Sequence, residues 1–251
     1  MKLSVIIPAL NEEKNIETAI DSVLIAFKNF KSSGEIIVIN DGSTDKTSFL
    51  VKEKIKKFPQ VLKMISHEKP QGIGSSFWDG VNNATGDVVV LFPGDNENDP
   101  QEILRYYSLM DQVDFVIPFI FNKEIRSILR RFLSFLYNFI IKISFSINLN
   151  YTNGTILCRR SVLQSLEHQS KGFFFQTDIL VRCIKKGYLY AEVPHRLNFR
   201  EKESSKAIKF SSFICLVKEY LYLLRDYYFR RHLFKKNAII IDSVTFIRKN
   251  E

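Results

Sequence analysis

The sequence predicts an α/β fold built on a doubly wound, mostly parallel sheet. Apolar runs such as VVVLF at 88–92 show no alternation with polar residues, which is typical of strands buried on both faces of a parallel sheet. These runs alternate with segments of helical periodicity, and a βαβαβ order favours parallel strands joined by helices. Polar motifs directly follow several of the runs. In folds of this kind, ligands bind beyond the carboxyl ends of the strands.

The elements follow from periodicity, taken in chain order. Strands are expected at 3–7, 35–39, 61–65, 87–92 and 113–117. Helices are expected at 11–30, 44–57 and 72–83, with a short one after Pro100 and a long amphipathic one at 123–148. Ser43 or Thr44 is expected to cap the second helix.

The second half of the chain is expected to add helices and one last strand. Gln176 and Asp178 are placed on a helix, 207–236 reads as basic and amphipathic, and 237–247 as a final short strand. Residues 1–206 are predicted to form one domain. Residues 207–251 are then a C-terminal amphipathic helical extension, packed on that domain or on a membrane surface.

Composition sets the class of protein. The chain has 251 residues of which 45% are hydrophobic, so it is globular rather than disordered. Its net charge of +9 predicts an anionic partner. Three widely spaced cysteines favour a reducing compartment. The N-terminus turns acidic too early for a signal peptide, and no apolar run reaches the roughly 18–20 residues that span a bilayer.

An acidic segment follows the fourth predicted strand. The run at 88–92 ends at Pro93-Gly94, and Asp95, Asn96, Glu97, Asn98 and Asp99 come next. Carboxylate and amide oxygens at a strand end suit a hard divalent cation that bridges to phosphate. A solvated turn is the alternative, because Pro, Gly, Asn and Asp are ordinary turn residues.

Two further motifs fall on the same predicted rim. PALNE occupies 8–12 after the first strand, and NDGSTD occupies 40–45 after the second. Each motif alone fits a turn or a helix cap. Because the ends of parallel strands meet at one edge of the sheet, three such motifs in order indicate a ligand site.

These motifs resemble a known family. PALNEE, NDGSTDKT, KPQGIGSSFWDG, ATGDVVVLFPGDNENDP and NGTILCRRSVL are similar to the family 2 glycosyltransferases of GT-A fold. Within that family the chain resembles the polyprenol-phosphate sugar synthases of the dolichol-phosphate mannose synthase type, from Val5 to about Lys206. The resemblance implies inverting transfer of a sugar from a UDP- or GDP-linked donor to a lipid phosphate, with Mg²⁺ or Mn²⁺.

The resemblance also implies roles for single residues. The nucleotide-binding set is Pro8, Leu10, Asn11, Glu12, Asp41 and Ser43. Asn40 stands where the family usually has a second acid. Asp95 matches the second aspartate of the DxD motif, and Glu97 falls where a glutamine often reaches the metal. Pro93 occupies the position of the first aspartate and offers no ligand atom, so the metal set narrows to Asp95 and Glu97.

A polar stripe marks the segment 123–148. Arg126, Arg130, Ser134 and Asn138 recur every fourth residue, and guanidinium groups bind phosphate bidentately. A solvated helix face is the alternative. The last three residues match the family's R-x3-S-x3-N pattern, whereas Ile120 stands near the position of a family arginine.

A second basic group lies at 192–206. Arg200, Ser205 and Lys206 match the family, while Glu203 replaces a glycine and Ser204 a glutamate. The resemblance gives a predicted catalytic set of Asp95, Arg130, Ser134, Arg200 and Lys206, in which Arg200 and Lys206 contact donor or acceptor phosphates.

Two other polar residues invite a role. Asp178 is a candidate general base for a hydroxyl acceptor, or else a structural carboxylate. His195 follows Pro194 in a predicted loop and is expected at the surface without a role.

The basic aromatic segment 207–236 and the apolar face of 123–148 suit an anionic membrane surface. No nucleic-acid-binding motif is visible, so nucleic acid is not an expected partner; an outer pair of structural helices is the alternative. We expect a cytoplasmic protein attached peripherally to the cytoplasmic face of the membrane.

Three functions remain open: transfer to a polyprenyl phosphate, transfer to a glycan hydroxyl, or nucleotide-sugar binding without turnover. The third is motivated by Pro93 and Asn40.

Overall fold

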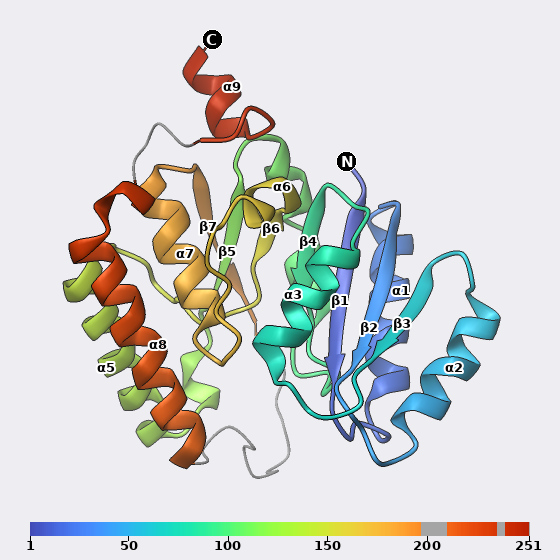
Figure 1. Ribbon diagram of the computed structural model, residues 1–251. Helices are drawn as coiled ribbons and strands as arrows, with labels where there is room; N and C mark the ends of the chain where they lie inside the picture. Colours follow the sequence, from blue (N-terminus) through green and yellow to red (C-terminus); the bar gives the residue numbers. More distant parts are fainter. Residues whose placement is uncertain (197–209, 235–238, 251) are drawn as a thin grey trace.

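The computed structural model describes residues 1–196, 210–234 and 239–250. Its centre is a seven-stranded sheet in the order β3-β2-β1-β4-β6-β5-β7 (Figure 1). The strands are β1 (Leu3–Ala9), β2 (Gly34–Asn40), β3 (Leu62–Ser66), β4 (Val88–Leu91), β5 (Phe115–Ile120), β6 (Leu157–Arg159) and β7 (Tyr190–His195). Among the strands of the described residues, only β6 runs antiparallel to its neighbours. The predicted α/β fold with a mostly parallel sheet is therefore confirmed.

Helices cover both faces of the sheet, as Figure 1 shows. On one face α1 (Ile16–Asn29), α2 (Thr47–Lys57), α4 (Pro100–Leu104) and the 3-10 turn η1 (Tyr107–Asp111) pack in one apolar core. On the other face α3 (Ile73–Asn83), α6 (Arg160–Gln164) and α7 (Phe175–Lys186) form a second core. The buried runs of β1, β2 and β4 separate the two cores, which explains why they lack polar alternation.

Two helices begin later than predicted. Asn11 takes a positive φ of 56°, and the Glu12 carbonyl accepts the N–H groups of Asn15 and Ile16 in a turn. The helix α1 therefore starts at Ile16 rather than at Asn11. The second helix starts at Thr47, where the Asp45 carboxylate accepts the backbone N–H at 2.9 Å. The prediction that Ser43 or Thr44 caps this helix is therefore wrong.

The long amphipathic segment is broken near its start. A 3-10 turn, η2 (Lys123–Ile125), is followed by extended backbone at Arg126 with ψ 144°. The helix α5 (Ile128–Phe145) then begins, with the Ser127 hydroxyl accepting the Arg130 N–H at 3.4 Å. Arg126 therefore precedes the helix rather than forming its first turn.

The predicted strand at 237–247 is wrong for the part that the structure describes. Residues from Val244 to Asn250 form α9 instead. The fully buried Asp114 carboxylate accepts the Val244 N–H at 2.8 Å, the Thr245 N–H at 3.1 Å and the Thr245 hydroxyl. A buried carboxylate at the first turn satisfies the free N–H groups of a helix, so it favours helix over strand here.

The C-terminal helix α8 (Phe210–Phe229) is tied to α7 by a buried ion cluster. Arg182 of α7 donates to Asp178 at 2.9 Å and to Asp226 of α8 at 3.0 Å. All three side chains are at most 5% exposed. Figure 1 shows α5 and α8 side by side at the edge of the molecule, where they contact each other. Within the described residues, no helix is long and apolar enough to cross a bilayer.

A buried carboxylate also links the amino ends of β2 and β1. Glu35 accepts hydrogen bonds from the Ser4 hydroxyl, the Thr85 N–H and hydroxyl, and pairs with Lys63 at 2.8 Å. Burial alone raises the pKa of Glu35, but these donors together outweigh burial and lower it to about 2.

Glu35 gives a pH-dependent prediction. A depressed carboxylate pKa stabilises the fold above the ordinary pKa of 4.5 and loses that contribution as pH falls towards about 2. We expect Glu35→Gln to lower the free energy of unfolding at pH 7 by about 2–3 kcal/mol and to flatten its decline between those two pH values. Urea unfolding at several pH values measures both effects. An unchanged acid slope in the variant would contradict this account.

Candidate active site

The PALNE and NDGSTD motifs are joined by hydrogen bonds at the carboxyl edge of the sheet. The Ser43 hydroxyl accepts the Asn11 N–H at 3.0 Å, and the Asn11 side chain accepts the Thr44 N–H at 2.8 Å. The Thr47 hydroxyl accepts the Glu12 N–H at 2.8 Å. Leu10 is 39% exposed beside them. The structure thus brings together the predicted nucleotide-binding residues of β1 and of the loop after β2.

Asp41 sits deeper in this rim and organises the start of α3. Its carboxylate accepts the Gln71 N–H at 2.7 Å and the Gly72 N–H at 2.9 Å. It also contacts His67 Nδ1 at 2.7 Å, while His67 Nε2 lies 3.0 Å from Asp79. Both ring nitrogens of His67 therefore face carboxylates. The Asp41 side chain is 5% exposed, and its contacts give it a structural role in the site.

The acidic segment lies next to PALNE because β1 and β4 are paired neighbours. The Gly94 N–H donates to the Pro8 carbonyl at 3.0 Å. The Asp95 carboxylate accepts the Glu97 N–H at 3.1 Å, and Asp99 caps α4 by accepting the Gln101 N–H at 2.8 Å. Asp99 is therefore a structural residue, and Asp95 and Glu97 remain the carboxylates near the rim.

The described residues contain no group of three or more His, Cys, Asp or Glu side chains arranged to hold a metal ion. Two carboxylates still suit Mg²⁺, which usually keeps several waters and binds one or two carboxylates together with substrate phosphates. The donor set thus fits an ion that needs the substrate to complete its coordination.

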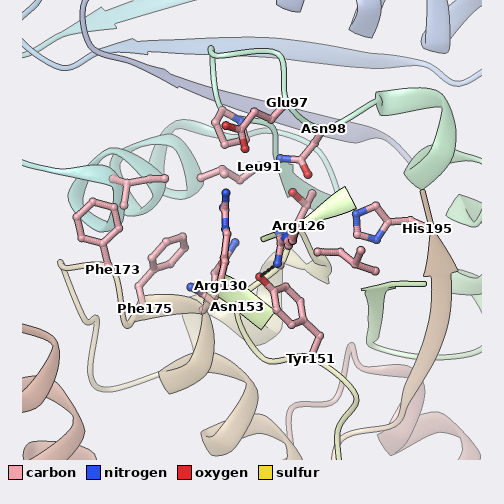
Figure 2. A pocket seen from close by; sticks show the side chains of 16 residues that line it. Leu91, Glu97, Asn98, Arg126, Arg130, Tyr151, Asn153, Phe173, Phe175 and His195 are labelled. Atoms are coloured by element: carbon pink, nitrogen blue, oxygen red, sulfur yellow. Dashed lines mark hydrogen bonds between the residues drawn. The ribbon is translucent and has the colours of Figure 1, made fainter. Parts of the chain in front are cut away.

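A cavity of about 240 Å³ opens between the end of β4 and the segment after β5. Figure 2 shows Arg126 and Arg130 extending into it from one side, with Glu97 and Asn98 opposite. Arg126 donates to the Tyr151 hydroxyl at 3.4 Å, and its guanidinium lies 5.8 Å from the centre of the Tyr151 ring. The apolar lining residues are Ile73, Leu91, Pro93, Ile120, Phe173 and Phe175.

Glycines bring the far wall of the cavity close to the rim. Gly72 takes a positive φ of 95°, and a Cβ on Gly74 would lie 2.4 Å from the Lys171 carbonyl. Only glycine permits this approach of α3 to the segment that carries Phe173. The glycines of the KPQGIG motif therefore shape the cavity through backbone contact, while Ile73 of the same motif lines it.

The predicted catalytic residues are only partly brought together. Arg130 and Glu97 line the cavity, whereas Asp95 and Ser134 are not among its lining residues. Asn138, the last residue of the polar stripe, accepts the Thr152 hydroxyl at 3.0 Å and so has a structural contact. Arg200 and Lys206 lie outside the residues that the structure describes.

The other candidate, Asp178, is 1% exposed and lies in the ion cluster with Arg182. Burial raises the pKa of Asp178 to about 7, although Arg182 acts in the opposite sense. It does not line the cavity, so its position favours the structural role over that of a general base.

Sequence reasoning missed several lining residues. His195 was expected on the surface, but it ends β7, is 2% exposed and lines the cavity. Tyr151 lines it too, and so do Asn153, from the NGTILCRRSVL motif, and Gln176, which was placed on a helix; neither was predicted in the site. The strand β7 was not predicted. Without it, a histidine directly after Val-Pro could not be placed at a strand end beside the cavity.

Comparison with known proteins places the chain in a family. Residues 4–167 match the profile of Glycosyl transferase family 2. The chain belongs to this family. The predicted resemblance to the family is thereby confirmed.

Curated relatives match part of their own length. The chain is 24% identical over 143 residues to the dodecaprenyl-phosphate galacturonate synthase of Rhizobium johnstonii, covering 56% of this chain and 42% of that protein. It is 29% identical over 111 residues to the undecaprenyl-phosphate 4-deoxy-4-formamido-L-arabinose transferase of Photorhabdus laumondii, covering 44% and 34%. The aligned regions span less than half the length of these relatives.

Solved structures support the fold. Glucosyl-3-phosphoglycerate synthase from Mycobacterium tuberculosis, crystallised with Mn²⁺, UDP-glucose and phosphoglyceric acid, matches with a TM-score of 0.62 at 18% identity. The match covers 90% of this chain and 79% of that one. The predicted GT-A fold is therefore confirmed.

The Asp41 network predicts unequal effects of two substitutions. Asp41→Ala leaves two backbone N–H groups and the buried His67 ring without their acceptor, and we expect it to lower the free energy of unfolding by about 2–4 kcal/mol. Asp79→Ala removes one contact of a side chain that is 41% exposed, so a loss below about 1 kcal/mol is expected. Urea unfolding of the two variants compares them, and equal losses would refute the framing role of Asp41.

Proposed function

We propose that this protein is an inverting glycosyltransferase that moves a sugar from a UDP- or GDP-linked donor to a polyprenyl phosphate. The observation that carries the proposal is the convergence of Arg126 and Arg130 in one cavity at the nucleotide rim. Guanidinium groups bind phosphate with charge-assisted, bidentate hydrogen bonds. The names of the curated relatives, which are polyprenyl-phosphate sugar transferases, support the same acceptor.

The donor is assigned to the rim beside the cavity. Its nucleotide lies along the PALNE and NDGSTD motifs, where Leu10 is exposed and Asn11 is held by Ser43 and Thr44. The diphosphate then reaches the acidic segment, because Gly94 is hydrogen-bonded to Pro8. In this arrangement the anomeric carbon of the sugar comes between the acidic segment and the arginines.

Asp95 and Glu97 are the residues we assign to a Mg²⁺ or Mn²⁺ ion. Such an ion, when bound, supplies Lewis-acid stabilisation of the departing nucleoside diphosphate. The solved glucosyl-3-phosphoglycerate synthase with Mn²⁺ supports this choice of metal. With Pro93 in place of a third carboxylate, this chain depends on the donor phosphates to complete the coordination.

Sugar transfer to a phosphate acceptor does not require a strong general base. A phosphate acceptor is already an anion, so the arginines have to orient it for in-line attack rather than deprotonate it. The burial of Asp178 in an ion pair agrees with this acceptor. Transfer to a glycan hydroxyl would need a base in the cavity, and among the described lining residues Glu97 and His195 are the two side chains that could act as one. Binding without turnover, suggested by Pro93 and Asn40, stays as the remaining alternative.

An assay with labelled donors distinguishes these three functions. UDP- and GDP-sugars are incubated with the protein, a short polyprenyl phosphate and a divalent cation. Label in a lipid that is released by mild acid supports transfer to phosphate, whereas acid-stable label in a glycan supports the hydroxyl acceptor. Nucleotide binding without transfer, unchanged in Asp95→Ala, would contradict both enzyme functions.

The surface next to the arginines supports a lipid acceptor. Nine large apolar side chains of α5 are between 41% and 82% exposed, namely Ile128, Leu129, Phe132, Leu133, Phe135, Leu136, Phe139, Ile140 and Ile143. The neighbouring α8 exposes Phe213, Leu221 and Phe229, together with Lys218 and Arg225, and the exposed Arg230 follows its last residue. Apolar and basic side chains on adjacent helices suit an anionic membrane. We infer peripheral attachment to the cytoplasmic face.

Two neighbouring arginines give a matched test of the acceptor site. Arg130 lines the cavity, whereas Arg131 is exposed on α5 outside it. We expect Arg130→Ala to raise the KM for a short polyprenyl phosphate by about 10- to 100-fold through loss of a charged hydrogen bond. Arg131→Ala should change it less than about threefold. Steady-state kinetics with a water-soluble acceptor measures both, and intact turnover in Arg130→Ala would show that the acceptor site is wrong.

Membrane attachment is tested on vesicles. The triple variant Phe132→Ser, Phe135→Ser and Phe139→Ser removes exposed rings of α5, and Phe49→Ser removes a 61% exposed ring of α2 on another helix. Sedimentation with vesicles containing phosphatidylglycerol should show at least about a tenfold loss of partitioning for the triple variant. Phe49→Ser should bind like the unchanged protein. Equal binding of both variants would contradict attachment through α5.

A further inference from the structure

His195 is an unusual side chain within the described residues. It is 2% exposed, and neither ring nitrogen has a hydrogen-bond partner in the structure. Buried polar groups are nearly always paired, because an unmade bond loses the hydration of the group without replacement. A buried imidazole in this state therefore needs a physical explanation.

The sheet fixes the position of this residue. His195 is the last residue of β7 and pairs in register with Ile120 of β5. Its backbone carbonyl accepts the Phe121 N–H at 3.3 Å. The ring lines the cavity, and Figure 2 shows it on the same side as Arg126 and Tyr151. The ring with the two unpaired nitrogens is thus part of the cavity wall.

Charge favours an anion as the missing partner. Burial lowers the pKa of His195, and the Arg126 guanidinium acts in the same direction. The Phe119 backbone acts in the opposite direction and raises the pKa, although its contact with the ring does not have the geometry of a hydrogen bond. A lowered pKa favours the neutral imidazole, which retains one N–H to donate. An oxygen that carries negative charge forms the strongest hydrogen bonds with two guanidinium groups, and it can accept this N–H as well.

We propose that His195 donates a hydrogen bond to a phosphoryl oxygen that is held in the cavity by Arg126 and Arg130. The cavity of about 240 Å³ lies below the roughly 300–1,000 Å³ typical of sites for whole small molecules, so it suits a phosphate headgroup better than a complete nucleotide-sugar. The phosphoryl group belongs either to the lipid acceptor or to the donor diphosphate. Assignment to the acceptor rests on the proposed function.

Binding, rather than turnover, tests the inference. Titration calorimetry measures the affinity for a short polyprenyl phosphate and, separately, for UDP and GDP with Mg²⁺. His195→Phe keeps the bulk of the ring but removes both nitrogens, and we expect it to weaken binding of the lipid phosphate by about 10- to 100-fold. His195→Gln restores an amide N–H and should retain most of the affinity. The exposed His232→Gln serves as the matched control and should bind normally.

Each result has one meaning. Weaker binding of the lipid phosphate alone supports His195 at the acceptor, and weaker binding of the nucleoside diphosphate alone supports it at the donor phosphate. Affinities that stay within about twofold for both ligands in His195→Phe overturn the inference. Because binding is measured without turnover, a protein that binds but does not transfer would refute the proposed function and leave the inference standing.

A measurement on the unchanged protein covers the case in which His195→Phe does not fold. Histidine ring ¹⁵N resonances are recorded during titration with inorganic phosphate, with His195 assigned by its absence in His195→Gln. A phosphate-dependent shift of the His195 resonance, with the His232 resonance constant, is expected. A His195 resonance that stays fixed at saturating phosphate would overturn the proposal.

Discussion

The carboxyl ends of the parallel strands meet at one edge of the sheet, and the whole site depends on this constraint. Pairing of β1 with β2 places Ala9 beside Asn40, and pairing of β1 with β4 places Ile6 beside Leu91. The loops that follow are then close enough for Gly94 to bond Pro8. Three motifs far apart in sequence share one rim because backbone hydrogen bonds fix the register of the strands.

The second wall of the cavity depends on the antiparallel strand β6. Because β6 runs opposite to both β4 and β5, these two strands point the same way, and β7 follows β5 in parallel. The ends of β5 and β7 therefore reach the same edge as the end of β4. This geometry delivers Ile120 and His195 to the cavity and starts the segment that carries Arg126. The cationic wall thus faces the acidic segment across the sheet edge.

Sequence patterns predicted the parts of this arrangement that are local and strongly apolar. β1, β2 and β4 are buried on both faces, so their composition alone marks them as central strands. β6 has three residues and β7 mixes exposed with buried positions, so neither leaves a clear periodic signal. The apolar run before Asn250 resembles a strand, but the distant Asp114 carboxylate favours the helix α9. Such long-range contacts are invisible to periodicity.

The same limit applies to the site. Arg130 and Glu97 were found because spacing and family resemblance both point to them, and the structure places both at the cavity. His195 and Tyr151 acquire their positions only from the packing of β7 and of the segment before β6, which no local pattern encodes. Arg126 was predicted from helical spacing, yet it reaches the cavity from extended backbone before α5. Arg126 therefore lies at the cavity as predicted, but the reason is this extended backbone and not helical spacing.

The central claim is that the cavity between the acidic segment and α5 holds the acceptor phosphate. A crystal structure of the protein with a nucleoside diphosphate, Mg²⁺ and a short polyprenyl phosphate tests it most directly. The account predicts density for the acceptor phosphate within hydrogen-bond distance of Arg126 and Arg130, with the nucleotide along the PALNE and NDGSTD motifs. A phosphate bound elsewhere, such as at Arg225 of α8 and the following Arg230, with both cavity arginines facing only solvent, would contradict it.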